Sequence, residues 1–152
     1  MCIRDSILLR TQFANHLPIV LGDKIQLQQV ILNLVLNGIE AMSGVADGAR
    51  ELSVSSEKVE AGKEMVPDNA LTGPESASLL IAVRDSGPGL DATELQQVFA
   101  PFYTTKSQGM GMGLAISRSI VEAHQGHLWA TANVPQGAIF QFTLPVPSTG
   151  FQ

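Results

Sequence analysis

The chain has 152 residues, enough for one domain with a sizeable core, and its apolar fraction of 45% is ordinary for a globular protein. A net charge of −5 and a pI near 5.0 argue against a protein that binds the backbone of a nucleic acid. The single cysteine, Cys2, excludes an intramolecular disulfide and a cysteine-rich zinc site. No apolar run approaches the roughly 18 residues that cross a bilayer. We therefore expect a cytoplasmic domain that contacts neither nucleic acid nor membrane, while its parent protein could be membrane-anchored elsewhere.

The chain divides into three parts. Residues 1–6 have no pattern of their own, and we interpret them as a fragment boundary or a non-native start. The predicted domain covers 7–146, and 147–152 form a frayed tail. Within the domain, weak alternation predicts an edge strand over 7–13, and a short apolar run at 19–21 could form a second small strand.

A long helix is predicted over 24–42, where apolar residues recur at helical spacing and Asp23 is a good N-cap residue. Apolar side chains occupy most of its circumference, so we expect it to be largely buried. A strand is predicted to begin at Leu52. The Gly- and Pro-rich segment 60–76 is predicted to be a surface loop.

The second half of the chain is interpreted from its apolar runs, an N-cap residue and a terminal glycine. The expected elements are a central strand at 77–84, a short helix capped by Asp91 and reaching Val98, a second long helix at 113–125 ended by Gly126 at the C′ position, and strands at 127–134 and 138–144. Strands and helices mix without a regular βαβ repeat. The expected fold class is therefore α/β, a two-layer sandwich in which a mixed sheet of about five strands packs on about three helices.

Three glycines alternate with methionines at 109–113, directly before the second long helix. Glycine lets the backbone approach a ligand closely, and the free N–H groups of a helix N-terminus bind anions, most often phosphate. A second glycine turn, at 85–89, follows the predicted central strand. Together with the intervening segment 99–112, which we interpret as a lid, the two turns predict a nucleotide site.

Asn33 and Asn37 lie four residues apart on the first long helix, so their side chains share one face. Two asparagines inside an apolar helix need a reason, because asparagine is a middling helix former. An amide oxygen can coordinate a hard cation such as Mg²⁺. The alternative, given equal weight, is that both amides hydrogen-bond to neighbouring loops.

Asp85 ends the predicted central strand, where its carboxylate can accept a hydrogen bond from an exocyclic amine such as adenine N6. Gly87 and Gly89 would let the base approach the backbone. An ordinary Asp-Gly turn is at least as well supported by these residues alone.

The segment 99–106 contains two phenylalanines that could anchor the lid, followed by Thr104, Thr105 and Lys106, which offer hydroxyls and a positive charge to phosphates. Alternatively, its aromatics fill the core beside a hinge, and the two interpretations are compatible. Arg118 could reach a phosphate or pair with a carboxylate, although a plain surface arginine is preferred. The histidines lack zinc spacing, and His124 and His127 are interpreted as structural or exposed.

Taken in order, these segments resemble the ATP-binding catalytic domain of sensor histidine kinases, with its N, G1, F and G2 boxes. The matching segments are 33–38, 85–89, 99–106 and 109–114, and the similarity extends from about residue 17 to residue 145. The details are most similar to the nitrogen-regulatory and oxygen-sensing branch. The resemblance implies the Bergerat (GHKL) fold, with ATP and Mg²⁺ as ligands.

By this resemblance, Asn37 would bind Mg²⁺, and Asn33 would help to hold the metal and the phosphates. Asp85 would recognise adenine beside Gly87 and Gly89. The remaining implied contacts are Lys106 as a catalytic residue and, in the cofactor-binding set, Thr104, Thr105, Gly109, Gly111, Gly113, Leu114 and Thr143, the last supporting the adenine pocket.

Related ATPases carry a glutamate where Asn33 sits and use it as the general base for water. Since an amide takes no proton at neutral pH, hydrolysis should be slow, and the γ-phosphoryl group stays available for a better nucleophile. The resemblance implies that this nucleophile is a histidine on a separate dimerisation domain, which passes the group to the receiver domain of a response regulator. The alternatives are an ATP-binding module without phosphotransfer and an anti-sigma-type serine kinase on the same fold.

Overall fold

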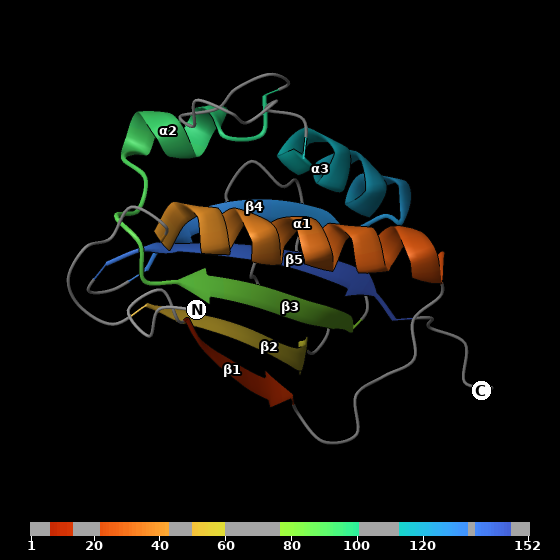
Figure 1. Cartoon of the computed structure of the whole chain (residues 1–152). Coiled ribbons are helices and arrows are strands. Elements are labelled where there is room, and N and C mark those ends of the chain that lie inside the picture. The colour runs from red at the N-terminus through yellow and green to blue at the C-terminus, as the bar shows by residue number, and fades with distance from the viewer. Residues whose placement is uncertain are drawn as a thin grey trace.

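The computed structural model describes residues 7–13, 22–42, 50–59, 77–100, 113–133 and 136–146. In these residues the chain forms, in order, β1 (Leu8–Phe13), α1 (Lys24–Met42), β2 (Glu51–Val59), β3 (Ser78–Asp85), α2 (Ala92–Gln97), α3 (Gly113–Ala123), β4 (His127–Ala132) and β5 (Ala138–Pro145). The sheet has the order β1-β2-β3-β5-β4; β1 is parallel to β2, and the other neighbouring pairs are antiparallel. Figure 1 shows α1 and α3 side by side over one face of this sheet. The predicted two-layer α/β fold with a mixed sheet is confirmed.

The predicted elements agree with the observed ones to within a few residues at each end. The second long helix ends at Ala123 instead of residue 125, and β4 ends at Ala132 instead of residue 134. The small strand at 19–21, the loop at 60–76 and the terminal segments lie outside the described residues.

The main core lies between the sheet and the helices. Residues directly opposite each other on neighbouring strands share a face of the sheet, and successive residues of one strand alternate between faces. Val83 is paired with both Val54 and Phe140, and all three are buried in the main core beneath α1 and α3. The opposite face carries a smaller buried cluster of Val59, Leu80 and Trp129.

Both predicted N-caps are confirmed. The Asp23 Oδ1 accepts hydrogen bonds from the backbone N–H groups of Ile25 and Gln26 at 3.0 and 3.1 Å, in the first turn of α1. Asp91 and Glu94 form a reciprocal capping box at the start of α2, with distances of 2.8 and 3.0 Å. These contacts satisfy backbone donors that have no partner within their own helix.

The C-terminus of α3 corrects one prediction. The residue at C′ is Gln125, with φ of +66°, and Gly126 follows it at C″. The Gly126 N–H donates to the Val121 carbonyl and the Gln125 N–H to the Glu122 carbonyl, both at 2.9 Å, which is the Schellman arrangement. Gly126 is needed for another reason, because a Cβ there would lie 1.8 Å from the Thr143 carbonyl oxygen.

The Gln125→Gly substitution should therefore stabilise the domain by about 1 kcal/mol, because a left-handed backbone costs a residue with a Cβ roughly that much. Thermal unfolding followed by circular dichroism measures the change. Gly126→Ala is the matched comparison one residue away, and it should be strongly destabilising. A lower stability for Gln125→Gly would contradict the assignment of Gln125 as the C′ residue.

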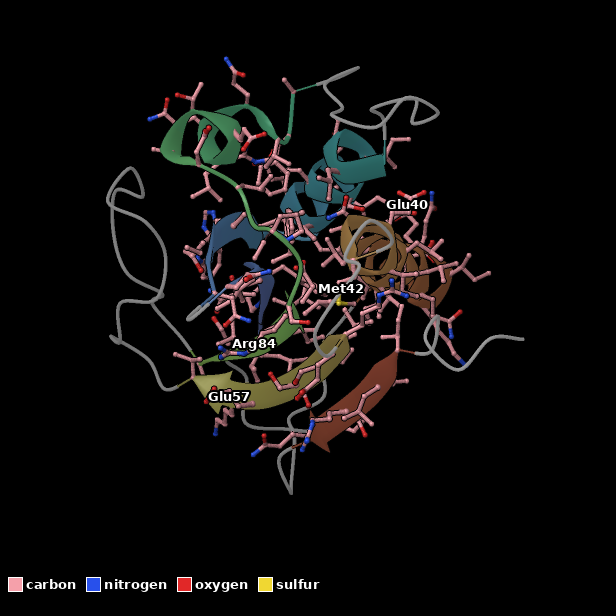
Figure 2. The ribbon with its side chains drawn as sticks, turned by 60° about the vertical axis from the view of Figure 1, so that its left-hand side comes forward. Glu40, Met42, Glu57 and Arg84 are labelled. Atoms are coloured by element: carbon pink, nitrogen blue, oxygen red, sulfur yellow. The ribbon has the colours of Figure 1, made fainter. Side chains whose placement is uncertain are left out.

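The expectation that α1 is largely buried was wrong. Its buried residues, Val30, Leu34, Gly38 and Met42, form one stripe that faces the sheet. On the outer side, Ile25, Leu32 and Leu36 are 76%, 56% and 47% exposed. Figure 2 shows Met42 pointing between α1 and the sheet, while Glu40 points outward. A two-layer fold covers each helix on one side only, so an apolar outer surface cannot be predicted from the composition of the helix.

Candidate nucleotide-binding site

The Asp85 side chain is held at the end of β3 by backbone donors. Its Oδ1 accepts hydrogen bonds from the N–H groups of Gly87, at 2.9 Å, and Ala138, at 3.3 Å. Only 3% of Asp85 is exposed. Two donors, one from the turn after β3 and one from the start of β5, fix the orientation of the carboxylate, which is the preorganisation that a recognition group needs.

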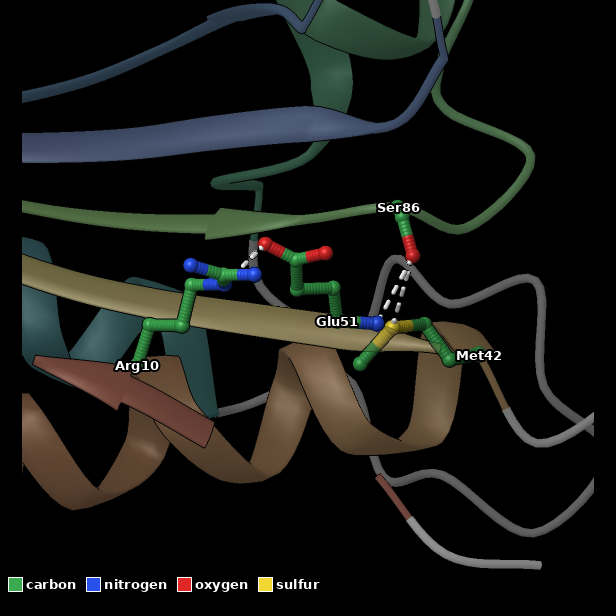
Figure 3. Close-up of polar contacts among 4 residues, drawn as sticks. All are labelled: Arg10, Met42, Glu51 and Ser86. Atoms are coloured by element: carbon green, nitrogen blue, oxygen red, sulfur yellow. Dashed lines mark hydrogen bonds and ion pairs between the residues drawn. The ribbon is translucent and has the colours of Figure 1, made fainter. Parts of the chain in front are cut away.

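Ser86, the next residue, ties this turn to two other elements, as Figure 3 shows. Its Oγ accepts a hydrogen bond from the Glu51 N–H at 2.9 Å and contacts the Met42 Sδ at 3.5 Å. The turn is thereby attached to the start of β2 and the end of α1. The Arg10–Glu51 ion pair beside it, at 2.6 Å, joins exposed side chains and adds little stability.

A second turn, at Gly137, packs directly against the Asp85 turn. Gly137 has φ of +113°, and a Cβ on it would lie 1.9 Å from the Asp85 carbonyl oxygen. Gly89 has φ of +83°, and a Cβ on it would lie 2.9 Å from the Gly137 carbonyl oxygen. Asn133 Nδ2 donates to the Asp85 carbonyl oxygen at 2.9 Å. The positions of these backbones therefore leave no room for a Cβ at Gly137.

Sequence reasoning missed these supporting residues. Gly137 lies in the short gap between the predicted strands at 127–134 and 138–144, and Ala138 and Asn133 carry no signal of a site. The glycine of a short hairpin loop is a weak indication by itself. Its link to Asp85 depends on β5 lying next to β3, which the sequence does not specify.

The helix α1 contacts the Asp85 turn at two points. A Cβ on Gly38 would lie 3.6 Å from the Asp85 Cβ, and one on Gly87 would lie 3.0 Å from the Ala41 carbonyl oxygen. The small size of Gly87 is thus explained by its contact with α1, whereas a Cβ on Gly38 would come closest to the Leu52 Cδ1 of β2, at 2.7 Å. Whether Gly87 and Gly89 also lie beside a base stays a prediction.

Further back along the same helix, the Asn33 side chain contacts the start of α3. Its Nδ2 donates to the Gly113 carbonyl oxygen at 3.3 Å and to the Ser117 Oγ at 3.1 Å. The hydrogen-bonding alternative is therefore realised for the amide nitrogen of Asn33. Asn37 lies one turn later and is half-buried.

One helix thus connects the two glycine turns that the sequence singled out. Gly113, the last residue of the predicted turn at 109–113, accepts a hydrogen bond from Asn33. The Asp85–Gly87 turn lies against α1 at Gly38 and Ala41. At 1.5 Å per residue, the positions 33 and 41 are about 12 Å apart along the helix axis. Gly113 and the Asp85–Gly87 turn therefore both lie against α1.

The described part of the predicted lid segment is its first two residues, and Phe99 is anchored in the core. The Phe99 ring packs edge-on against Phe140, with 6.0 Å between ring centroids. The Arg118 guanidinium lies 4.8 Å from the centre of the Phe99 ring, and Arg118 also pairs with Glu122 at 3.5 Å. Arg118 therefore pairs with a carboxylate, one of the alternatives left open, and stacks on an aromatic ring.

Thr143 does not belong with the other site residues, which corrects the sequence-based expectation. It is paired with Leu80 in the sheet, and Leu80 lies in the cluster on the face away from the helices. Asp85 lies on the helix-facing side, in register with Leu52 of the main core. Strand alternation places the two side chains on opposite faces, so Thr143 cannot support a pocket at Asp85.

His124 is structural, as expected from its sequence context. Its Nε2 accepts a hydrogen bond from the Asp23 N–H at 2.9 Å, which places the ring proton on Nδ1, 2.8 Å from the Ile120 carbonyl oxygen. The first turn of α1 is thereby tied to the last turn of α3. His127 is exposed at the start of β4.

The other predicted site residues divide into two sets. Leu114 is half-buried and packs against the main core. The residues of the predicted lid, Thr104, Thr105, Lys106, Gly109 and Gly111, lie outside the described residues, and their roles stay predictions. In the part of the chain that the structure describes, no three His, Cys, Asp or Glu residues are grouped so that they could hold a metal ion.

Residues 22–148 match the family described as histidine kinase-, DNA gyrase B- and HSP90-like ATPases. The chain belongs to this family. The match includes both glycine turns, the asparagine pair and the whole sheet except β1. ATP is accordingly the nucleotide of this domain, and the observed arrangement is the GHKL fold that the motifs implied.

Several curated relatives are named sensor histidine kinases or sensor proteins. The chain is 41% identical over 130 residues to sensor histidine kinase TmoS of Ectopseudomonas mendocina, covering 86% of this chain and 12% of that protein. It is 39% identical over 141 residues to sensor protein FixL of Bradyrhizobium diazoefficiens, covering 93% of this chain and 25% of that protein. The chain thus spans at most a quarter of the length of these two relatives. The names of these relatives favour neither of the two alternative functions.

Solved structures agree on the fold. The nucleotide-free catalytic domain of histidine kinase ThkA superposes with a TM-score of 0.69 at 30% identity, covering 93% of this chain and 80% of that one. Full-length ShkA, in complex with AMPPNP, gives a TM-score of 0.72 at 23% identity, covering 95% of this chain and 27% of that one. Among the described helices, none is long and apolar enough to cross a membrane.

Proposed function

We propose that this domain binds ATP with Mg²⁺ along α1 and donates the γ-phosphoryl group to a histidine on the dimerisation domain of a sensor kinase. From that histidine the group would pass to the receiver domain of a response regulator. The observation that carries the proposal is the contact of α1 with both glycine turns, at Asn33 and at Gly38. In this arrangement Asp85 binds the adenine amine, and Gly113 lies at the phosphate end with Lys106 and the other lid residues.

The oxygen atoms available as ligands suit a magnesium ion that is bound by the protein and the nucleotide together. Mg²⁺ prefers oxygen ligands and is usually bound through substrate phosphates and a few protein groups. The described residues offer no carboxylate cluster, whereas the amide oxygens of Asn33 and Asn37 lie on one side of α1. Asn37 would contribute the direct protein ligand, and the ion would neutralise charge on the phosphates.

The residues also favour transfer over hydrolysis. An amide at position 33 cannot act as the general base that would activate water, and its nitrogen is already used to bind Gly113 and Ser117. Asp85, the buried carboxylate at the other end of the site, is held by two backbone N–H groups. A neutral imidazole nitrogen needs no strong base, so positioning and charge neutralisation suffice for the transfer.

The test is to mix this chain with the histidine-bearing dimerisation domain of a homologous sensor kinase and γ-labelled ATP. Acid-labile, base-stable label on the partner domain is expected. Saturable ATP binding without label would leave an ATP-binding module, and acid-stable label on a serine would indicate the serine kinase instead.

Asn37→Ala should lower the phosphotransfer rate at least about tenfold and remove most of its dependence on Mg²⁺, because losing a group at a metal site typically costs that much. Initial rates across a Mg²⁺ titration measure the effect. Gln28→Ala, at an exposed position on the opposite side of the same helix from Asn37, is the matched control and should behave like the wild type. An unchanged Mg²⁺ dependence in Asn37→Ala would reassign this side chain to a structural role.

A further inference from the structure

Ser117 is a buried hydroxyl that the proposed function does not use. It lies on the first turns of α3, and none of its surface is exposed. Among the described residues, its hydrogen-bond partner is the Asn33 Nδ2, at 3.1 Å. Burying a serine costs free energy unless its hydroxyl is hydrogen-bonded, so packing alone does not explain a serine at this position.

The Gly113 carbonyl, next to Ser117, fixes which end of the Asn33 amide faces α3. Asparagine can present either its oxygen or its NH₂ group, and the choice follows from the partners. The Gly113 carbonyl oxygen, at 3.3 Å, can only accept a hydrogen bond, so the nitrogen must face α3. The Asn33 Oδ1 is consequently turned away from Gly113 and Ser117.

The two contacts of Asn33 differ in their surroundings. The hydrogen bond to Gly113 is exposed and the longer of the two, whereas the one to Ser117 is partly buried. Water competes for an exposed hydrogen bond but much less for a buried one. Ser117 is therefore the stronger constraint on the amide.

The backbone around this contact is also fixed. At the opposite end of the same helix pair, the Asp23 N–H binds the His124 ring. The helices run antiparallel, because Asp23 lies opposite His124 and Asn33 lies opposite Gly113. Since α3 is bound to α1 near both of its ends, the Ser117 hydroxyl is held in position relative to Asn33.

We propose that Ser117 is a positioning residue of the nucleotide site: with the Gly113 carbonyl, it binds the Asn33 amide nitrogen and so leaves the Asn33 Oδ1 to face the Mg²⁺ ion that would be held with the nucleotide. This inference rests on the proposed function.

The test is a double-mutant cycle of Ser117→Ala and Asn33→Ala in this chain, read out by calorimetric titration with ATP in Mg²⁺ and in EDTA. Ser117→Ala should weaken MgATP binding about fivefold, as expected for one lost hydrogen bond. The loss should be absent or much smaller in EDTA. In the Asn33→Ala background, Ser117→Ala should have no further effect on affinity, because the group that it positions is gone.

Two controls separate positioning from a general loss of structure. Ser119→Ala, on the exposed side of α3, should match the wild type in affinity and melting temperature. If Ser117→Ala is too unstable to measure, Ser117→Cys fills the space while offering only a weak acceptor, and it should show the same Mg²⁺-dependent loss.

Additive effects in the cycle, or an equal loss with and without Mg²⁺, would overturn the positioning role and leave Ser117 as a packing residue. If the wild-type chain itself shows no heat with MgATP, the proposed function fails first, and this inference fails with it. The two failures are thus distinguished by the wild-type titration.

Discussion

Gly137→Ala is expected to destabilise the domain by at least about 3 kcal/mol, the combined cost of a disfavoured backbone conformation and of steric overlap. Its φ of +113° disfavours any side chain, and the new Cβ would lie 1.9 Å from the Asp85 carbonyl oxygen. Neither atom can move alone, because the Ala138 N–H and Asn133 Nδ2 both bind Asp85. For a domain of this length, the melting temperature should fall by roughly 10 °C.

Thermal unfolding and ATP titration of the same samples measure this effect. Gly113→Ala is the matched control for stability, because its Cβ would meet only the Asn33 Cγ, at an ordinary 3.9 Å. Gly113→Ala should therefore melt at or above the wild-type temperature. A Gly137→Ala variant with wild-type stability would show that the Gly137 and Asp85 turns do not pack as described.

Asp85→Asn is expected to weaken ATP binding by about 1–3 kcal/mol, or roughly 5- to 150-fold, the cost of mispairing a buried polar group. The N–H groups of Gly87 and Ala138 require an acceptor, so the oxygen of the new amide must face them. Its NH₂ group then replaces the second carboxylate oxygen and meets the adenine amine donor to donor. Guanine carries an acceptor at that position, so the preference for ATP over GTP should fall as well.

Parallel titrations with ATP and GTP test both parts of this expectation. Thr143→Val is the matched control, because it removes a polar group from the opposite face of the same sheet. It should leave the affinity for ATP unchanged. Wild-type affinity in Asp85→Asn would remove Asp85 from adenine recognition, and a loss in Thr143→Val would contradict the assignment of the sheet faces.

The sequence could indicate the chemistry of the site because that chemistry is local. An asparagine pair four residues apart and two glycine turns are each contained in short segments, and all of them lie within the residues that match the family. The caps at Asp23 and Asp91 could be predicted for the same reason, since a capping side chain bonds within its own helix turn.

Other features required the arrangement of elements in space. The partner of Asp85 is Ala138, 53 residues away, and the partner of Asn33 is Ser117, 84 residues away. No local pattern links such pairs, because their proximity is set by the strand order and by the contact between α1 and α3. Gly126 likewise could not be interpreted from local sequence. Its place after the helix predicts a C′ residue, whereas a glycine is required there because the backbone packs against the Thr143 carbonyl in β5.

The sequence alone thus determined which groups can hold a nucleotide, because side-chain chemistry and backbone freedom are properties of each residue. The tertiary structure decided which of these groups meet. It placed Thr143 on the face of the sheet away from the helices and left the outer side of α1 exposed. It also placed the Asn33 Nδ2 where it donates a hydrogen bond to Ser117 of α3. Alternation in a strand and periodicity in a helix fix which residues share a face. Which face meets the site depends on the neighbouring elements, and these are chosen by the fold as a whole.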